Sequence, residues 1–249
     1  MPDRGRHDDV VASEFGRAAP AFAERTAGRF DHLDVVRFAR LRPGDDVVEV
    51  GAGTGNFLAL FAGARRRVAV DITHAMLREA RARHPGVDAV GGDALRLPLR
   101  DRSFDLVASA QALHHMPRPV PALAEMRRVA ARGGRVLVVD QVSTESYEQT
   151  VMMTELEKVR DPSHAASRPP SAFRIMLRAA ALRVVDERVV EETQRLSKWM
   201  WPGEFPRRRI DDVRAFIERY GDETGMDFRR DGDDWAFTRR RIMILATPE

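Results

Sequence analysis

The sequence predicts an α/β fold, built on a doubly wound and mostly parallel sheet with an antiparallel C-terminal strand and a helical cap. Three observations lead to this prediction. Short apolar runs alternate with amphipathic stretches through residues 31–142, a glycine-rich turn follows the first of these runs, and polar residues follow the later ones. Strict alternation of strand and helix is typical of parallel sheets that carry helices on both faces.

The first strand and its turn are the most informative segment. Residues 47–50 are apolar apart from Glu49, and Gly51, Gly53 and Gly55 follow before an expected helix over 56–62. Glycine accepts positive φ and lets the backbone approach a ligand, while the first N–H groups of a helix are free donors. The spacing differs from the dinucleotide fingerprint Gly-x-Gly-x-x-Gly, so the later strands must decide what this turn binds.

Polar residues end the next three strands. Asp71 follows an apolar run twenty residues after Gly51, where a carboxylate can bind the two hydroxyls of a ribose. Asp93 ends the third run and can accept a hydrogen bond from an exocyclic amine such as that of adenine. The fourth run, 104–110, leads into His114 and His115. Since the carboxyl ends of parallel strands share one edge, we expect these groups to gather there.

The helices between these strands are justified by their end signals. Residues 31–41 are amphipathic and stop at Pro43-Gly44, Thr73 is placed to cap the third helix, and Pro119 begins a helix that Gly133-Gly134 ends. A strand over 136–140 follows. These units complete the parallel part of the predicted sheet.

The C-terminal half contains weaker patterns. We expect a helix over 148–160, a helix from a Ser171 cap to Leu182, a strand over 183–190 and a helix over 210–220. The turn 231–234 pairs 226–230 with a strand over 235–247, as an antiparallel addition to the sheet edge. The cluster Trp199-Met200-Trp201-Pro202 is predicted to be a buried lid. The triplets 65–67, 207–209 and 239–241 are arginines, for which a solvated surface is favoured over an anionic-substrate site.

Taken together, these residues resemble the class I S-adenosylmethionine-dependent methyltransferases, of the ubiquinone/menaquinone C-methyltransferase-like (methyltransferase type 11) small-molecule group. The matching residues are Glu49 to Gly55, Asp71 with Ile72 and Met76, Gly92-Asp93-Ala94, Leu97-Pro98, Asp101 to Asp105 and Leu113-His114-His115. The resemblance covers roughly 13–142, including a segment, 15–23, that is similar to the helix closing over the cofactor in such enzymes.

The resemblance implies a Rossmann-like sheet of seven strands within one methyltransferase domain, 1–249. Its cofactor-binding core is expected over 8–142, substrate-cap insertions over 143–235 and the last strand over 236–247. S-adenosyl-L-methionine is the implied cofactor and S-adenosyl-L-homocysteine the product. The implied cofactor contacts are Phe22, Glu49, Gly51, Ala52, Gly53, Gly55, Asp71, Ile72, Met76, Gly92, Asp93, Ala94, Ala110 and Gln111.

Nine of these contacts have an expected role. The three glycines allow close approach of the methionyl part, and Glu49 binds its ammonium group directly or through water. Asp71 binds the ribose, Asp93 and the Ala94 N–H bind adenine, and Ile72 and Met76 pack on the adenine faces.

The chemistry implied by this cofactor places few demands on the chain. A sulfonium makes its methyl carbon electrophilic, so holding a nucleophile in line in a dry pocket supplies about 7–11 kcal/mol, whereas a general base adds only about 100- to 10,000-fold. His115 and His114 are the catalytic candidates, but orienting the loop or filling space near the sulfonium is the favoured role. His164 and Tyr147 are weaker candidates.

The amino-acid composition excludes several classes of protein and of site. The chain has 249 residues, a net charge of +3 with acids and bases interspersed, and no cysteine, which excludes disulfides and thiolate metal sites. No apolar run is long enough to cross a bilayer. We therefore expect a cytoplasmic protein with a small-molecule substrate, no nucleic-acid partner, no membrane insertion and no metal site, and leave a homodimer open.

Three other functions share parts of this pattern. A nicotinamide oxidoreductase would also have the first turn and Asp71. Its function would not require Gly92-Asp93-Ala94 or the stretch from 97 to 105. A nucleic-acid methyltransferase is disfavoured, because 109–112 has neither the prolines nor the aromatic residue expected to hold a flipped base. The remaining alternative is a repurposed enzyme that binds S-adenosylmethionine and catalyses cyclisation or rearrangement without methyl transfer.

Overall fold

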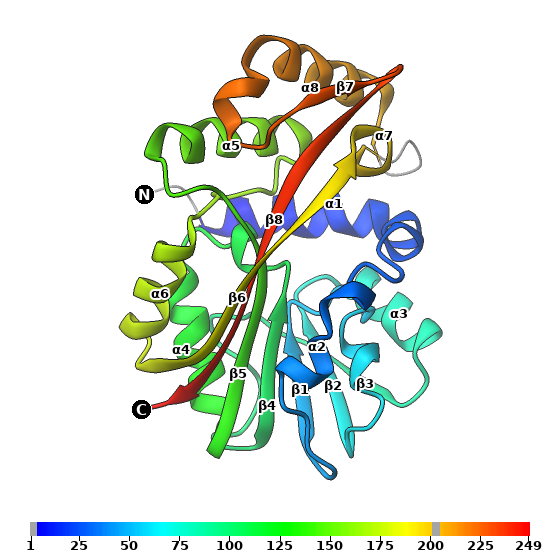
Figure 1. The fold of residues 1–249 in the computed structure, drawn as a ribbon. Helices are drawn as coiled ribbons and strands as arrows, with labels where there is room; N and C mark the ends of the chain where they lie inside the picture. The colour runs from blue at the N-terminus through cyan, green and yellow to red at the C-terminus, as the bar shows by residue number, and fades with distance from the viewer. Residues whose placement is uncertain (1–3, 201–204) are drawn as a thin grey trace.

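The computed structural model describes residues 4–200 and 205–249, and its centre is a single twisted sheet (Figure 1). The strand order is β3-β2-β1-β4-β5-β8-β6, with the short β7 paired to β8. The strands are β1 (Asp46–Val50), β2 (Arg66–Asp71), β3 (Val87–Gly91), β4 (Phe104–Ala110), β5 (Ala130–Val142), β6 (Leu182–Arg195), β7 (Arg229–Asp231) and β8 (Asp234–Pro248).

The pairing confirms the predicted Rossmann-like, doubly wound sheet. β1 to β5 pair in parallel with their neighbours, and β8 is antiparallel to both β5 and β6. β8 therefore lies inside the sheet, and β6 forms the edge that we expected the C-terminal strand to form. The hairpin between β7 and β8 is confirmed, with Arg230 opposite Trp235.

The sheet is buried on both faces because its central strands are apolar at successive positions. In β1 all five residues are buried; Val48 faces one hydrophobic cluster and Val47 the other. The first cluster includes residues of α4 (Pro119–Val129) and α6 (Pro170–Ala179), and the second includes residues of α2 (Val35–Phe38) and α3 (His74–Arg83). Near-continuous apolar strands are what a sheet covered by helices on both sides requires.

Three local predictions are corrected. The helix expected over 31–41 is divided into η1 (Asp31–Leu33) and α2, because Asp34 between them adopts the left-handed conformation with φ 48°. The segment after the glycine turn contains only the short 3-10 helix η2 (Leu58–Phe61). Ser171 lies inside α6, whose first residue is Pro170, and its backbone N–H and hydroxyl donate to the carboxylate of Glu145.

A cap lies beyond the carboxyl ends of the parallel strands. The helix α1 (Arg4–Arg25) crosses this edge of the sheet, and above it lie α5 (Tyr147–Arg160), α7 (Leu196–Trp199), α8 (Arg207–Tyr220) and η4 (Gly221–Thr224), as Figure 1 shows. The predicted helices over 148–160 and 210–220 are confirmed as α5 and α8. β6 and β8 continue from the sheet into the cap, so the two layers share strands.

The cap has a hydrophobic cluster of its own. Trp199 and Met200 are each 1% exposed and pack with Leu156 of α5 and Phe237 of β8. These two residues are buried as predicted, whereas Trp201 and Pro202 of the expected lid lie outside the described residues. Within the described ranges, no helix is long and apolar enough to cross a membrane.

Candidate active site

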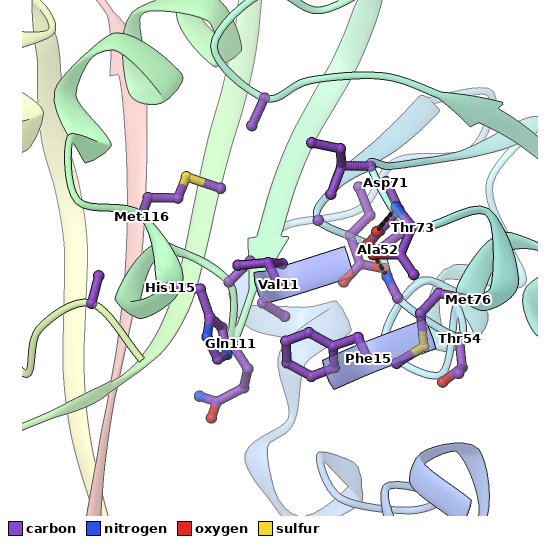
Figure 2. A pocket seen from close by; sticks show the side chains of 18 of the residues that line it. Val11, Phe15, Ala52, Thr54, Asp71, Thr73, Met76, Gln111, His115 and Met116 are labelled. Carbon is purple, nitrogen blue, oxygen red and sulfur yellow. Dashed lines mark hydrogen bonds between the residues drawn. The ribbon is translucent and has the colours of Figure 1, made fainter. Parts of the chain in front are cut away.

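A cavity of about 1030 Å³ opens at the carboxyl edge of the sheet, beneath α1. Figure 2 shows Asp71 and Ala52 on one side of it, Phe15 and Val11 of α1 across it, and Gln111, His115 and Met116 on the side of β4. The predicted contact residues that line it are Phe22, Glu49, Gly51, Ala52, Gly53, Asp71, Ile72, Met76, Gly92, Asp93, Ala94, Ala110, Gln111 and His115. The structure thus brings together nearly all of the predicted site.

The glycine turn is shaped by backbone conformation. Gly51 and Gly53 have φ of 71° and 53°, which L-residues other than glycine rarely adopt. A Cβ at Gly51 would lie 2.6 Å from the Cβ of Ala112, whereas a Cβ at Gly53 would have only the ring of Phe22 within 4.0 Å. The turn is anchored to β2 because the N–H groups of Gly51 and Ala52 both donate to the carbonyl of Val70. The backbone at Gly53 is therefore open to a ligand.

Gly55 has a different position from the one expected. It does not line the cavity, and a Cβ there would lie 3.2 Å from Ala80 and 3.2 Å from His84 on the α3 side. Its positive φ of 74° and the lack of a side chain let the turn pack closely against α3. Its location does not support our assignment of Gly55 to the methionyl part of the cofactor.

Asp71 is held rigidly at the end of β2. One carboxylate oxygen accepts from the N–H of Gly53 at 2.7 Å and the other from the N–H of Thr73 at 2.8 Å. Burial raises the pKa of Asp71, and these two backbone donors oppose the rise. Each carboxylate oxygen can accept more than one hydrogen bond, so both retain capacity for hydroxyl donors.

Glu49 is the most unusual acid of the cavity. It is 1% exposed, and its Oε2 has no hydrogen-bond partner within the described residues. Burial raises the pKa of Glu49 well above its ordinary value, and the nearby Asp71 carboxylate raises it further. An unpaired buried carboxylate is unfavourable unless a cationic donor joins it. The site therefore fits an ammonium group at this position.

Arg29 is the basic counterpart and was missed by the sequence analysis. It lines the cavity in the turn that follows α1, and within 4–200 and 205–249 its guanidinium makes no hydrogen bond or ion pair. Burial lowers the pKa of Arg29 well below its ordinary value, and the neighbouring Arg239 and Arg241 lower it further. Nothing in the local sequence distinguishes Arg29 from the many exposed arginines, because only the fold aims its guanidinium into the cavity.

The arginines near Arg29 correct another prediction. Arg239 and Arg241 are 3% and 2% exposed, so the third arginine triplet is not a solvated surface at these two positions. Arg241 pairs with Glu192 at 2.6 Å. Arg239 donates to the amide oxygens of Gln111 and Gln141 at 3.1 and 2.9 Å. Burial lowers the pKa of Arg239 to about 9. A cationic group thus lies behind the Gln111 wall of the cavity.

The adenine side of the predicted site is less polar. Asp93 accepts from the N–H of Leu95 at 2.8 Å and lines the cavity together with Ala94. Met76 is 1% exposed, whereas Ile72 is 39% exposed. Ile72 is therefore accessible at the cavity, and Met76 forms part of its apolar wall.

The two adjacent histidines have separate roles. His114 is buried, its Nδ1 lies 2.6 Å from Oδ1 of Asp140, and its backbone N–H donates to the same carboxylate at 3.2 Å. Burial lowers the pKa of His114 well below its ordinary value. His114 does not line the cavity, so its position does not support the prediction that it is catalytic; it holds the loop after β4 against β5.

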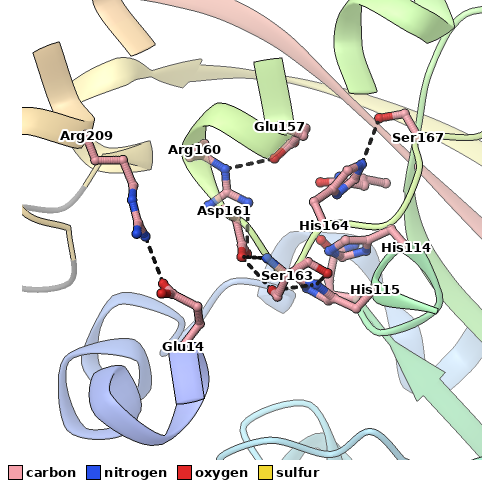
Figure 3. Close-up of polar contacts among 12 residues, drawn as sticks. Glu14, His114, His115, Glu157, Arg160, Asp161, Ser163, His164, Ser167 and Arg209 are labelled. Carbon is pink, nitrogen blue, oxygen red and sulfur yellow. Dashed lines mark hydrogen bonds and ion pairs between the residues drawn. The ribbon is translucent and has the colours of Figure 1, made fainter. Parts of the chain in front are cut away.

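His115, in contrast, lines the cavity and is fixed from behind. Its Nδ1 lies 3.0 Å from Oγ and 3.1 Å from the carbonyl oxygen of Ser163, and Ser163 Oγ donates to Asp161 at 2.5 Å (Figure 3). The ring of Phe15 meets the His115 ring edge to face at 5.0 Å. Ser163 and Asp161 were not predicted, since their loop approaches His115 only through the fold.

The weaker candidates differ in position. His164 lines the cavity, with Nε2 at 3.2 Å from Ser167 Oγ, and burial lowers its pKa to about 4. Tyr147 is 78% exposed and is not on the cavity wall. Within the described chain, no group of three or more acidic or histidine side chains is placed to hold a metal ion.

Comparison with known proteins finds similarity to methyltransferases. The model described as "Methyltransferase domain" matches residues 48–138. A demethylmenaquinone methyltransferase of Renibacterium salmoninarum is 40% identical over 143 residues, which cover 54% of this chain and 60% of that protein. The methyltransferase YcgJ of Bacillus subtilis is 27% identical over 220 residues, 84% of this chain and 87% of the relative.

A solved structure of a Bacillus halodurans C-125 protein superposes with a TM-score of 0.78 and 26% identity, covering 87% of this chain and 98% of the other. The chain spans less than two thirds of the Renibacterium relative but most of YcgJ and of the solved structure. The sheet order, the glycine turn and the acids at the strand ends agree with these matches. The chain is therefore similar to methyltransferases over most of its length, and the match to the methyltransferase domain covers residues 48–138.

Proposed function

We propose that this enzyme transfers the methyl group of S-adenosylmethionine to a small-molecule acceptor. The size of the cavity supports this proposal, because about 1030 Å³ is at the upper limit of what one drug-sized ligand occupies. Glu49, Asp71 and Asp93 line one part of the cavity, and Arg118 and His164 line another. The first part suits the cofactor, and the second leaves room for an acceptor.

The observation that carries the cofactor assignment is the pair of unpartnered ionic groups. Glu49 has a buried carboxylate oxygen without a partner, and Arg29 has a guanidinium without an acid partner in the described residues. The methionyl part of the cofactor carries an ammonium and a carboxylate. We assign the ammonium to Glu49 and the carboxylate to Arg29, so that each ligand charge meets an opposite charge of the protein.

The remaining cofactor contacts follow from the strand ends. Asp71 would accept from the ribose hydroxyls with the carboxylate oxygens that Gly53 and Thr73 already orient. Asp93 and the Ala94 N–H would bind the adenine edge, where both line the cavity. Gly53 would let the backbone approach the methionyl chain.

The bound cofactor supplies an electrophilic methyl carbon, and the chain has to position a nucleophile and exclude water. Val11 and Phe15 of α1 cover the cavity from one side and Met116 faces it from the other (Figure 2). These apolar side chains favour an acceptor with an apolar body. The name of the Renibacterium relative makes a reduced naphthoquinone a rational first acceptor to test.

The test is formation of S-adenosylhomocysteine by the purified enzyme with S-adenosylmethionine and a panel of phenols, amines and 1,4-naphthohydroquinone. Acceptor-dependent S-adenosylhomocysteine, with one methylated product per equivalent, supports the proposal. Conversion of an acceptor without S-adenosylhomocysteine would overturn methyl transfer and favour rearrangement at the same site.

A further inference from the structure

We infer that His115 is a general base for the acceptor, and that Ser163 and Asp161 are positioning residues that fix its protonation state. This inference rests on the proposed function, because it concerns the acceptor side of the same cavity. It starts from a chain of three hydrogen-bonded groups that ends on the cavity wall (Figure 3). The directions of the two hydrogen bonds decide which nitrogen of His115 is free.

Asp161 sets these directions. Burial raises the pKa of Asp161, whereas the charge of Arg160 and the two hydrogen bonds from Ser163 lower it, and the pKa lies well below its ordinary value. An ionised carboxylate can only accept hydrogen bonds. The hydroxyl of Ser163, 2.5 Å from Asp161 Oδ1, must therefore donate to it, and the backbone N–H of Ser163 donates to the same oxygen at 2.9 Å.

Ser163 in turn presents only acceptors to His115. Its hydroxyl proton is committed to Asp161, so Oγ accepts at 3.0 Å, and its carbonyl oxygen accepts at 3.1 Å. Both partners of Nδ1 are acceptors, which places the proton of the neutral imidazole on Nδ1. The other nitrogen, Nε2, then carries a lone pair.

The lone pair is available to a ligand. Ser163 is completely buried, whereas His115 lines the cavity. In the part of the chain that the structure describes, Nε2 of His115 has no hydrogen-bond partner. The backbone of His115 is held as well, because His7 of α1 lies 2.7 Å from its carbonyl oxygen. A nitrogen that is open, oriented and unprotonated is what a general base needs.

Titratable groups from several elements face His115. The acids that interact with His115 are Asp161 from the loop after α5, Asp140 of β5 and Asp71 of β2. The opposing groups are His114 and His164, in both of which burial lowers the pKa. Three carboxyl groups thus face the ring of His115, and the two neighbouring histidines are neutral at neutral pH.

The proton balance then specifies the acceptor. A lone pair of the nucleophile forms the bond to the methyl carbon, the electron pair of the broken bond stays on sulfur, and the proton of the nucleophile moves to Nε2 of His115. Water removes this proton after the product leaves. The acceptor class is therefore one that enters with an O–H or N–H group, such as a phenol, an enol or an amine.

The first test reads the tautomer directly. Long-range proton–nitrogen NMR of the protein with bound S-adenosylhomocysteine, above the titration of the histidines, should show His115 with Nδ1 protonated and Nε2 bare. Wild-type His115 protonated on Nε2 would overturn the inference, whether or not any variant folds.

Variants of Ser163 distinguish a role in positioning the His115 ring from a role in packing. Ser163→Ala should shift His115 toward the other tautomer by about threefold to tenfold, the effect of one lost hydrogen bond, and Ser163→Thr should restore the wild-type state. Ser167→Ala is the matched control, since it removes the same type of contact from His164. An unchanged His115 in a folded Ser163→Ala protein, or an equal effect of Ser167→Ala, would contradict the assignment.

The second test probes Nε2 chemically. Diethyl pyrocarbonate acylates unprotonated imidazole nitrogens, and peptide mass spectrometry reports each histidine separately. His115 should react about threefold to tenfold faster in the wild type than in Asp161→Asn or Ser163→Ala, and equal rates would contradict the account. A failure to bind S-adenosylhomocysteine would defeat the proposed function, whereas the acylation rates, measured on the protein without ligand, address His115 alone.

Discussion

At the scale of single residues, Glu49 and Arg29 are ionic groups that the fold itself leaves without partners of opposite charge. A buried charge without a partner destabilises the folded state. Glu49 is 1% exposed at the end of β1, and Arg29 lies in the turn after α1 on the wall of the same cavity. Side chains that lower stability in the free protein and match a zwitterionic ligand are typical of binding sites.

Replacing Glu49 with Gln tests this at one position. Glu49→Gln should lower the affinity for S-adenosylhomocysteine by about 1.5–3 kcal/mol, roughly 10- to 150-fold, because a charge-assisted hydrogen bond to the ammonium is lost. The same variant should be at least as stable as the wild type without ligand. Calorimetric titration and thermal melting measure both, with Glu79→Gln on α3 as the control. Unchanged affinity would remove Glu49 from the cofactor site.

The pH dependence of stability follows from the same carboxylate. The pKa of Glu49 in the folded protein lies well above 4.5, so above that pH the folded state binds the proton more tightly than the unfolded chain. The free energy of unfolding should therefore fall as pH rises from 4.5 through the folded pKa. In Glu49→Gln this component should be absent. Urea unfolding of both proteins across pH 4.5–8 gives the difference, and parallel curves would contradict the raised pKa.

At the scale of secondary-structure elements, α1 joins the sheet to the cap. It covers the cavity with Phe15 and Phe22, and its Glu14 pairs with Arg209 of α8 at 2.8 Å (Figure 3). Both side chains are about one-fifth exposed. Burial raises the pKa of Glu14, but Arg209 and Arg17 outweigh burial and hold the pKa below its ordinary value. The ion pair therefore holds α1 against α8 of the cap.

Glu14→Gln should loosen this contact. The loss should be about 0.5–1 kcal/mol, because the pair is partly screened by solvent, and hydrogen exchange of α1 should become faster while that of β1 stays unchanged. The contribution should be present above pH 4.5 and disappear as pH falls through the folded pKa of Glu14. Equal exchange of α1 in the variant and the wild type would show that the pair does not hold the helix.

The sequence predicted elements best where a periodic pattern coincided with a clear end signal. The strands over the core, α5, α8 and the C-terminal hairpin were recognised in this way. The helix over 31–41 was not, because Asp34 adopts a left-handed conformation that tertiary contacts impose and local propensity does not indicate. The position of β8 inside the sheet was also missed, since strand order depends on long-range pairing.

Prediction of the site residues was also limited by contacts that only the fold creates. Glu49, Asp71 and the glycine turn could be predicted because they follow strands at a common edge. Arg29 and the Ser163–Asp161 pair could not, because a turn after α1 and a loop after α5 are brought to the cavity only by the packing of the cap. Gly55 and His114 belong to the same motifs as true cavity residues, and only their direction in space separates them.

At the scale of the whole molecule, the sheet and the cap share β6 and β8. Seven strands in the order 3-2-1-4-5-8-6 form the platform, and the two longest continue into the cluster that contains Trp199 and Phe237. Strands that belong to both layers couple the folding of the cap to that of the core. The cavity is enclosed between them, so its shape depends on both.

Unfolding should therefore be cooperative across the two layers. The three tryptophans are at positions 199, 201 and 235, and Trp199 and Trp235 belong to the cap cluster. The fluorescence of Trp199 and Trp235 thus reports the cap, whereas far-ultraviolet circular dichroism reports the whole chain. The two transitions should coincide, and S-adenosylhomocysteine should raise both together. Separate transitions would show that the cap is an independent unit.

The central claim is that this cavity binds an adenosyl zwitterion through charges that the protein leaves unpaired. Calorimetric titration of the purified protein with S-adenosylmethionine, S-adenosylhomocysteine and NADH tests it most directly. The account predicts micromolar binding of the two adenosyl ligands and none of NADH, with lower affinity in Glu49→Gln and in Arg29→Met. Preference for NADH, or no binding of the adenosyl ligands, would contradict it.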